Sequence, residues 1–412
     1  MSWNKFLNSQ LTKSSFSKIS LFATSFTISQ GIMMVYSIIL ARYLGPEGYG
    51  YYATGYSLVG LWSFFISVGM DTWFLQRSRN KQETRTLSGE IIKAKMLIFL
   101  IWAPVLVIGL NQIKSITIEF LIICIFDVWS DSLFITLIYG LNIQQNYQKV
   151  AGILMVSRLG RLISVFFLMG LGVRDPALFA LFRLFFTIIG FFSALIAMKP
   201  EIKIKQVEIT KIPFRELTPF WLSEMLAQIY IMADVSLVSV LAGKVQVGLY
   251  SPATNVLSAL FIIPNSLYLY ILPKFSKKFA VNNKIPEKEI NISLIGFGLV
   301  GLFLFLGIVL SAEWIIPLVL GSAFVQTTQL LLKLSPIVFL KSLQFGFIAI
   351  IVSSKLQKYR LIPQFIAAII NVGLNFILIP KLGAEGAVLA YNLSELTLLV
   401  GYGTIVLVYK TK

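Results

Sequence analysis

The 412-residue sequence contains no histidine and only one cysteine. Without histidine, the chain lacks the commonest general base and the commonest zinc ligand. The cysteine, Cys124, lies in an apolar stretch, and one cysteine supplies neither a disulfide framework nor a thiolate metal site. These absences argue against an enzyme, and nothing in the sequence suggests a metal or an organic cofactor.

Charge is also scarce, since charged residues make up 13% of the chain, about half the share found in soluble domains. Apolar residues make up 57% and occur in blocks long enough to cross a bilayer, which takes roughly 20 helical residues. The blocks are continuously apolar, whereas the strands of a membrane barrel would alternate. The sequence therefore predicts an all-α polytopic membrane protein.

Twelve membrane spans are predicted. They lie at about 16–40, 51–74, 96–113, 116–140, 150–172, 177–198, 218–241, 247–272, 291–311, 325–352, 361–380 and 385–408. With the N-terminus inside, 25 of the 35 lysines and arginines fall on the inner side and five in the outer turns. By the positive-inside rule we expect both termini to be cytoplasmic, and the polar, basic start of the chain to be a leader left inside rather than a cleavable signal peptide. Topology thus explains the net charge of +17 without nucleic acid, and a further role in holding anionic inner-leaflet lipid stays open.

Two stretches of the chain are similar to each other. The first half contains "LARYLGPEGYGYYATG" and the second contains the fainter copy "VLAGKVQVGLYSPATN". A shift of 198 positions aligns Gly45 with Gly243 and Gly50 with Gly248. In both halves the stretch is the first outer turn, and glycine with Pro46 permits the sharp reversal between two helices. A gate or a lipid-facing role is the alternative interpretation of this turn.

The repeat predicts the organisation of the chain. Six spans follow six others in the same orientation, so we expect two pseudo-symmetric six-helix bundles, residues 1–200 and 201–412. Parallel repeats of this kind are typical of transporters in which two bundles rock about a site between them.

A longer stretch carries a family resemblance. Residues 39–79, "ILARYLGPEGYGYYATGYSLVGLWSFFISVGMDTWFLQRSR", resemble the opening of the polysaccharide-flippase family, which includes the Wzx-type O-antigen exporters. The family belongs to the MOP superfamily, with the MATE drug exporters and the lipid II flippases. The matching residues are Ala41, Arg42, Leu44, Gly45, Pro46, Glu47, Tyr49, Gly50, Gly69 and Asp71. The turn "KLGAEGAVLAYNLSE", residues 381–395, is similar to the family's entry to its last span.

This resemblance implies a MATE-like fold and transport in the bacterial inner (plasma) membrane, with no covalent chemistry. The implied substrate is an undecaprenyl-pyrophosphate-linked glycan, such as an O-antigen repeat unit of lipopolysaccharide biosynthesis, moved from the inner to the outer leaflet by alternating access. The implied partners are membrane lipids and the polysaccharide polymerase machinery, and the internal repeat favours a monomer. The alternative is a MATE-like antiporter of drugs or small molecules. A polymerase or glycosyltransferase is disfavoured because the outer turns are short.

Ionisable side chains inside spans are costly, so each one is a functional candidate. The candidates for a cationic cavity that binds pyrophosphate are Arg158, Arg161, Lys333, Lys341 and Arg183, with Arg42 in the first outer turn. The candidates for binding a coupling ion, H⁺ or Na⁺, or for salt bridges are Asp127, Asp131, Glu224, Asp234 and Glu395.

Helical spacing suggests how four of these charges meet. Asp127 and Asp131 are four residues apart and share a helix face, as do Arg158 and Arg161, which are three apart. Asp131 and Arg158 lie at similar depths, ~13 and ~12 Å from the inner ends of their spans. One hypothesis is an ion-pair ladder with the rungs Asp131–Arg158 and Asp127–Arg161. The other is that at least one arginine faces the cavity and binds phosphate, which suits its planar fork.

The remaining charges leave alternatives open. Lys333 and Lys341, eight residues apart on one face, either face the cavity or pair with Glu395 or Asp234. Arg183 either snorkels to the outer surface or receives the substrate late.

Several polar and proline positions complete the list of expectations. Asn371 and Asn375 share a face and either bind sugar hydroxyls or tie helices together. Pro104, Pro252, Pro264 and Pro336 fall inside predicted spans, where we expect kinks.

Overall fold

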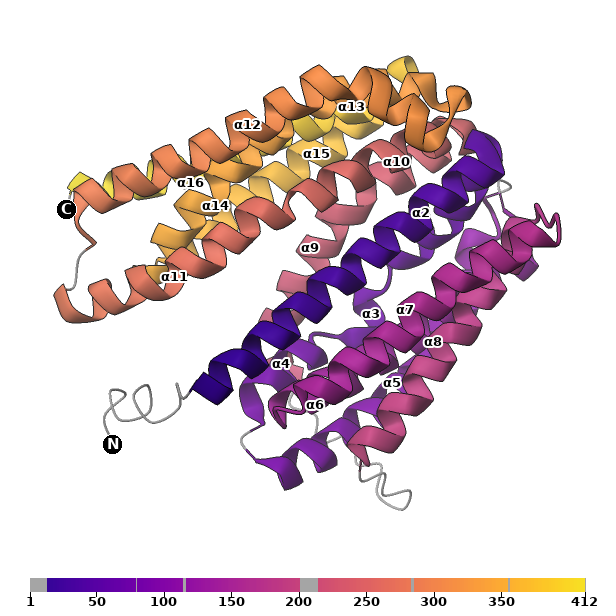
Figure 1. Cartoon of the computed structure of the whole chain (residues 1–412), viewed down its shortest axis with the longest axis horizontal. Helices are drawn as coiled ribbons and strands as arrows, with labels where there is room; N and C mark the ends of the chain where they lie inside the picture. Colours follow the sequence, from indigo (N-terminus) through magenta and orange to yellow (C-terminus); the bar gives the residue numbers. More distant parts are fainter. Residues whose placement is uncertain are drawn as a thin grey trace. The chain divides into compact units, whose positions relative to one another are not determined.

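The computed structural model describes residues 13–78, 80–113, 116–200, 214–282, 285–354 and 356–411. In these ranges every regular element is a helix (Figure 1), and eleven helices are long and apolar enough to cross a membrane. The prediction of an all-α polytopic membrane protein is confirmed, whereas the count of twelve spans and the cytoplasmic termini stay predictions. Residues 1–12 of the predicted leader and residues 201–213 of a predicted inner loop lie outside the described residues.

The chain divides into two compact units. Unit 1 comprises residues 1–37 and 58–228, and unit 2 comprises residues 38–57 and 229–412. Two helices contribute to both units, namely α2 (Lys13–Leu61) and α9 (Phe214–Leu241). The predicted division into residues 1–200 and 201–412 stays a prediction.

Unit 1 is built around α6. Besides parts of α2 and α9, its helices are α3 (Phe64–Ser67), α4 (Met70–Arg77), α5 (Lys81–Leu110), α6 (Ile118–Ile143), α7 (Tyr147–Gly170) and α8 (Pro176–Met198). α6 packs against α5, α7 and α8, and its buried face contributes Leu133, Phe134 and Leu137 to an apolar core. The side chains of Asn80 and Asp175 accept hydrogen bonds at the starts of α5 and α8 and satisfy backbone donors there.

Unit 2 is built around α14. Its helices are α10 (Lys244–Leu260), α11 (Ile262–Asn282), α12 (Glu287–Leu320), η2 (Ser322–Phe324), α13 (Val325–Leu334), α14 (Pro336–Ser353), η3 (Gln357–Arg360), α15 (Leu361–Leu382) and α16 (Ala384–Thr411). α14 packs against α11, α12 and α16, and α15 packs along α16 (Figure 1).

The two glycine turns found in the sequence have the same backbone conformation. Gly45, at the kink inside α2, has φ 72° and ψ 176°, and Gly243, before α10, has φ 85° and ψ 170°. Side chains other than glycine rarely adopt such positive φ values. The repeat predicted from the sequence therefore extends to backbone torsions. The stretch labelled α2 therefore consists of two helices that meet at Gly45, where the sequence places the turn between the first two spans.

The same turns also contact each other within unit 2. A Cβ atom at Gly50 would lie 1.8 Å from the carbonyl oxygen of Lys244, and one at Gly248 would lie 1.7 Å from that of Pro46. Positions 46 and 244 are also 198 apart, so the contact is reciprocal, as in a symmetric dimer interface. Both glycines are required because the two backbones touch.

The spans that follow these turns are interrupted at equivalent places. α2 ends at Leu61 and α3 begins at Phe64, while α10 ends at Leu260 and α11 begins at Ile262, which is 198 positions after Phe64. Pro264 contributes to the second break because it has no N–H for the carbonyl of Leu260. The helices are also interrupted at Pro336, where α14 begins after α13 ends at Leu334, so the expectation is confirmed at Pro264 and Pro336. By contrast, α5 and α10 run through Pro104 and Pro252 without a break.

Candidate functional site: two clusters of intramembrane charge

Unit 1 contains an arginine cluster, which we define as Asp127 and Asp131 of α6, Arg158 and Arg161 of α7, and Arg183 of α8. Arg183 Nε lies 2.8 Å from Asp127 Oδ2, and Arg161 Nη2 lies 3.2 Å from Asp131 Oδ1. Neither Asp127 nor Arg161 has any exposed side-chain area. Both acids are therefore neutralised within the unit.

The rungs predicted for this ladder are wrong. Asp131 pairs with Arg161 rather than Arg158, and Asp127 pairs with Arg183 rather than Arg161. The cause is a third helix, α8, which packs on both α6 and α7. Its Thr187 hydroxyl donates to Asp127 Oδ1 at 2.5 Å and accepts from Arg161 Nη2 at 2.6 Å, linking the two pairs. Arg183, expected either to snorkel or to receive substrate, is 20% exposed and held at Asp127.

Arg158 is the one arginine of this cluster that forms no salt bridge with either aspartate. It interacts electrostatically with Asp131, but no described acid lies within salt-bridge distance of it, and its buried Nε has no hydrogen-bond partner among the described residues. Three arginines face two aspartates, so the arginine cluster has a formal charge of one positive unit. Such a group suits an anion with several acceptor oxygens.

The sequence analysis did not predict a further ion pair in unit 1, between Lys95 and Asp71. Lys95, which was not among the candidate residues, has no exposed side-chain area and lies in α5. Its Nζ is 2.7 Å from Asp71 Oδ2, 2.8 Å from Ser132 Oγ and 2.9 Å from Thr136 Oγ1. Asp71, which with Gly69 ends the list of residues that match the family, therefore has a buried cation partner. A possible signal was the position of Lys95 directly before the predicted third span.

Gly69, which lies two residues before Asp71, brings α9 close. Gly69 has φ 72°, and a Cβ atom there would lie 2.5 Å from the backbone nitrogen of Trp221. Glu224 of α9 accepts hydrogen bonds from Ser67 Oγ at 2.5 Å and from the Gly69 N–H at 3.2 Å. Among the described residues this carboxylate has neutral hydrogen-bond partners and no salt bridge.

Unit 2 contains a carboxylate cluster, defined as Asp234 of α9, Lys341 of α14 and Glu395 of α16 with their hydrogen-bond partners. Lys341 Nζ lies 2.6 Å from Glu395 Oε1, which confirms one of the two interpretations of Lys341. Gln344 Nε2 donates to Glu395 Oε2 at 2.6 Å, and Tyr230 donates to Oε1. Glu395 is thus fully buried and neutralised.

Asp234 differs from Glu395 because its hydrogen-bond partners are neutral. It is 4% exposed, accepts from Asn375 Nδ2 at 2.6 Å and from Tyr250 Oη at 3.3 Å, and has no salt bridge to a described residue. Asn375 Nδ2 also donates to Asn371 Oδ1 at 3.1 Å, and the buried Asn375 Oδ1 has no described hydrogen-bond partner. Asn375 therefore ties α15 (Leu361–Leu382) to α9, as one of the two sequence interpretations expected, whereas its bond to Asn371 lies within α15.

Two predicted site residues lie at exposed positions. Lys333 pairs with Glu385 at 2.7 Å, not with Glu395 or Asp234, and its side chain is 50% exposed. Arg42 Nη1 donates to the carbonyl oxygens of Leu318 and Val319 at 2.8 and 3.2 Å. These carbonyls belong to the last turn of α12, where a cation is favourable.

No group of three His, Cys, Asp or Glu residues that could hold a metal ion occurs in the described part of the chain. Eleven long apolar helices in the described ranges, with ion pairs between some of them, define a polytopic membrane protein. The model of the family "Polysaccharide biosynthesis protein" matches residues 15–279, and the chain belongs to this family. No curated protein matches the chain.

Solved structures of the same fold are transporters and flippases rather than enzymes. A lipid II flippase, MurJ in an inward closed conformation, is similar with a TM-score of 0.72 and 16% identity, covering 94% of this chain and 87% of the other. An inward-facing multidrug resistance MATE transporter of the MOP superfamily has a TM-score of 0.74 at 14% identity, covering 93% and 96%. A eukaryotic MATE transporter, AtDTX14, has a TM-score of 0.58 at 15% identity, covering 95% of both chains. The protein is a multi-pass membrane protein of MATE-like fold.

Proposed function

We propose that this protein is a flippase that moves an undecaprenyl-pyrophosphate-linked oligosaccharide, an O-antigen unit or a related repeat unit, from the inner to the outer leaflet of the bacterial inner membrane. The family and the fold support lipid-linked transport, and the positive surplus of the arginine cluster supports an anionic head group. The single observation that carries the proposal is Arg158, a cation within a membrane helix without a salt bridge to any described acid. Its guanidinium is the group proposed to contact the pyrophosphate.

We further propose that transport is coupled to H⁺ or Na⁺ at Asp234. A carboxylate held by neutral groups can take up a proton or a cation without first breaking a salt bridge. The unsatisfied Asn375 Oδ1 supplies a second oxygen, and hard cations prefer oxygen ligands. The proposed partners are the lipid-linked glycan, membrane lipids and the polymerase that uses the flipped unit, and the proposed state is a monomer.

The second candidate is a MATE-like antiporter of drugs or small molecules. The observation that favours it is the same Asp234, because a buried carboxylate without a cation partner also suits a cationic substrate. The arginine cluster distinguishes the two functions, since a surplus cation repels such a substrate.

A complementation assay tests the proposal. The gene is deleted, and surface polysaccharide and lipid-linked repeat units are measured before and after rescue with wild type, Arg158→Ala or Lys333→Ala at matched membrane levels. We expect deletion to remove the polymer and to leave repeat units inside, Lys333→Ala to rescue, and Arg158→Ala to lower transport about 10- to 100-fold, the effect of losing a charge-assisted hydrogen bond.

Two outcomes would contradict this view in different ways. A normal polymer in the deletion strain would make the flippase function wrong and would put drug export first. Full rescue by Arg158→Ala, with polymer lost in the deletion strain, would keep the function and remove Arg158 from substrate binding.

A further inference from the structure

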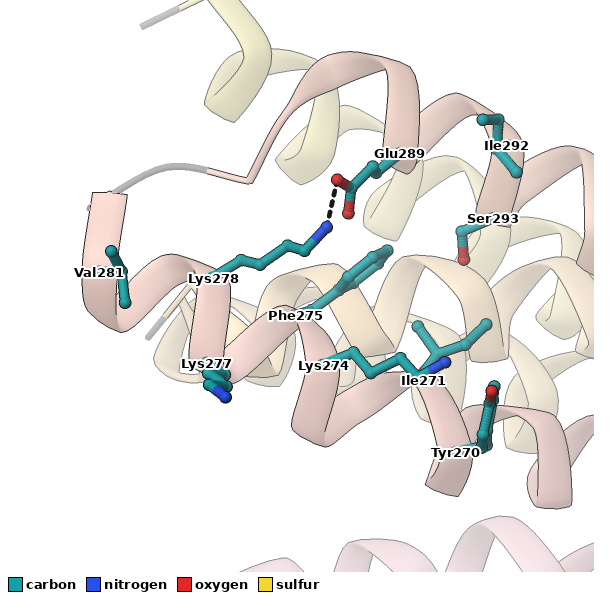
Figure 2. Close-up of a pocket in the computed structure, with 10 residues that line it drawn as sticks. All are labelled: Tyr270, Ile271, Lys274, Phe275, Lys277, Lys278, Val281, Glu289, Ile292 and Ser293. Atoms are coloured by element: carbon teal, nitrogen blue, oxygen red, sulfur yellow. Dashed lines mark hydrogen bonds and ion pairs between the residues drawn. The ribbon is translucent and has the colours of Figure 1, made fainter. Parts of the chain in front are cut away.

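A basic cleft lies in unit 2 and shares no residue with the carboxylate cluster of that unit. It has a volume of about 560 Å³, within the range of small-molecule sites, and lies between the end of α11 and the beginning of α12 (Figure 2). The α11 residues that line it repeat at helical spacing and form one face, and those of α12 do the same. The polar side chains among them are Tyr270, Lys274, Lys277 and Lys278 of α11 and Glu289 and Ser293 of α12.

The cleft has a surplus of positive charge. Lys278 reaches across to pair with Glu289, which neutralises one lysine (Figure 2). Lys274 Nζ lies 3.7 Å from the centre of the Tyr270 ring, and neither Lys274 nor Lys277 has a salt bridge to a described acid. Two lysines are therefore available to an anion.

A hydroxyl group in the cleft lacks a partner. Ser293 is 8% exposed, and its buried Oγ has no hydrogen-bond partner among the described residues. In Figure 2 this oxygen is turned from α12 towards α11, into the space lined by the apolar side chains of Ile271 and Phe275. An unsatisfied buried hydroxyl is costly, and an acceptor oxygen of a ligand would satisfy it.

The side chains around the cleft are apolar and exposed on the surface of unit 2. Ile292 is 59% exposed, and the same side of α12 continues with Ile295 and Leu299, which are 62% and 61% exposed. Val281, at the other wall, is 76% exposed. On a membrane-spanning helix such a stripe contacts acyl chains, and this end of α11 and α12 is the predicted cytoplasmic side, where anionic lipid accumulates.

From these observations we infer that the cleft binds the head group of an anionic glycerophospholipid of the inner leaflet. Its phosphate accepts hydrogen bonds from Lys274 and the Ser293 hydroxyl, Lys277 adds positive charge to the cleft, and the acyl chains lie along the exposed side of α12. This role goes beyond the proposed transport function and does not require it. A basic groove between two membrane helices is the arrangement that recognises phosphate-bearing lipids.

Native mass spectrometry of the whole chain tests the inference by titration with phosphatidylglycerol and with zwitterionic phosphatidylethanolamine. We expect one phosphatidylglycerol bound per chain, at least about tenfold more tightly than phosphatidylethanolamine. Lys274→Gln with Lys277→Gln should weaken it about 30-fold, Ser293→Ala about tenfold, and Lys274→Arg with Lys277→Arg should preserve binding. Equal binding of the two lipids, or no change in the glutamine variant, would overturn the inference.

Control substitutions outside the cleft distinguish binding at the cleft from non-specific electrostatic binding. Lys288 and Lys358 are exposed residues of unit 2 that do not line the cleft, so their double glutamine variant should bind within about twofold of wild type. Ser354 is likewise buried without a described partner and lies outside the cleft, so Ser354→Ala should leave binding unchanged. Weakening by these controls equal to that of the cleft variants would contradict the site.

Two competitors identify the source of the phosphate. Millimolar inorganic phosphate should leave the lipid bound, because it lacks the acyl chains. Undecaprenyl phosphate should compete no better than phosphatidylethanolamine. Displacement by either compound at concentrations comparable to those of phosphatidylglycerol would overturn the assignment to a membrane glycerophospholipid, without bearing on the complementation assay.

Discussion

The arginine cluster of unit 1 and the carboxylate cluster of unit 2 carry opposite surpluses of charge. In unit 1 two aspartates are paired and Arg158 is left over. In unit 2 Lys341 neutralises Glu395, and Asp234 is left with neutral partners. The contrast teaches that the two halves of a duplicated scaffold can carry opposite charge, and the two proposed roles, anion binding in unit 1 and ion coupling in unit 2, depend on this difference.

The repeat itself shows where the copies diverged. Both spans break at equivalent positions, before Phe64 and before Ile262. The first copy breaks again at Val68 and Gly69, both with positive φ, where the carboxylate of Glu224 binds, whereas α11 runs without interruption through the equivalent residues of the second copy. Broken helices at corresponding positions are a known pointer to transport sites.

The largest effect is expected from Arg183→Ala. It leaves the fully buried Asp127 without a cation, and breaking a buried pair costs about 3–5 kcal/mol. Thermal unfolding of the purified protein in detergent measures the loss. Adding Asp127→Asn should recover part of it, and a double variant no more stable than the single one would contradict this pairing.

A smaller loss is expected from Glu395→Gln, which strands Lys341. Because Lys341 is 21% exposed and retains the amide as an acceptor, we expect about 1–3 kcal/mol of destabilisation in the same unfolding assay. Tyr230→Phe, which removes one hydrogen bond to Glu395 and no charge, is the control and should cost less.

Asp234→Asn should change stability by less than about 1 kcal/mol, since it strands no cation. It should nevertheless abolish the dependence of transport on a proton or sodium gradient, measured in proteoliposomes. A variant that keeps this dependence would show that the carboxylate cluster does not couple transport, and the contrast between the two units would then be electrostatic only.

The smallest effect is expected from Lys333→Gln. Its pair with Glu385 is half-exposed, and such pairs contribute about 0–1 kcal/mol. Polysaccharide export and unfolding temperature should both match wild type. Loss of export at a normal protein level would instead support Lys333 as a substrate-binding residue.

Local patterns predicted much of this protein because they depend on local geometry. Continuous apolar blocks predict membrane helices, and the shift of 198 positions predicted turns whose glycines have nearly equal torsions. The spacing of Asp127 and Asp131 correctly placed both on one side of α6 towards arginines. Lys95 was missed because the hydropathy of a segment marks the apolar centre of a helix, whereas α5 begins at Lys81.

The amino-acid sequence by itself determined the membrane helices, the internal repeat and the helix faces that carry charge, because helical periodicity is a property of each segment alone. It did not determine the choice of partners. One residue of shift turns a side chain by about 100° around its helix, so no spacing rule says which arginine meets which aspartate. The packing of α8 beside α6 and α7 brings Arg183 and Thr187 to Asp127. Arg158 is therefore left without a salt bridge to a described acid, and its positive charge is the one on which the proposed function depends.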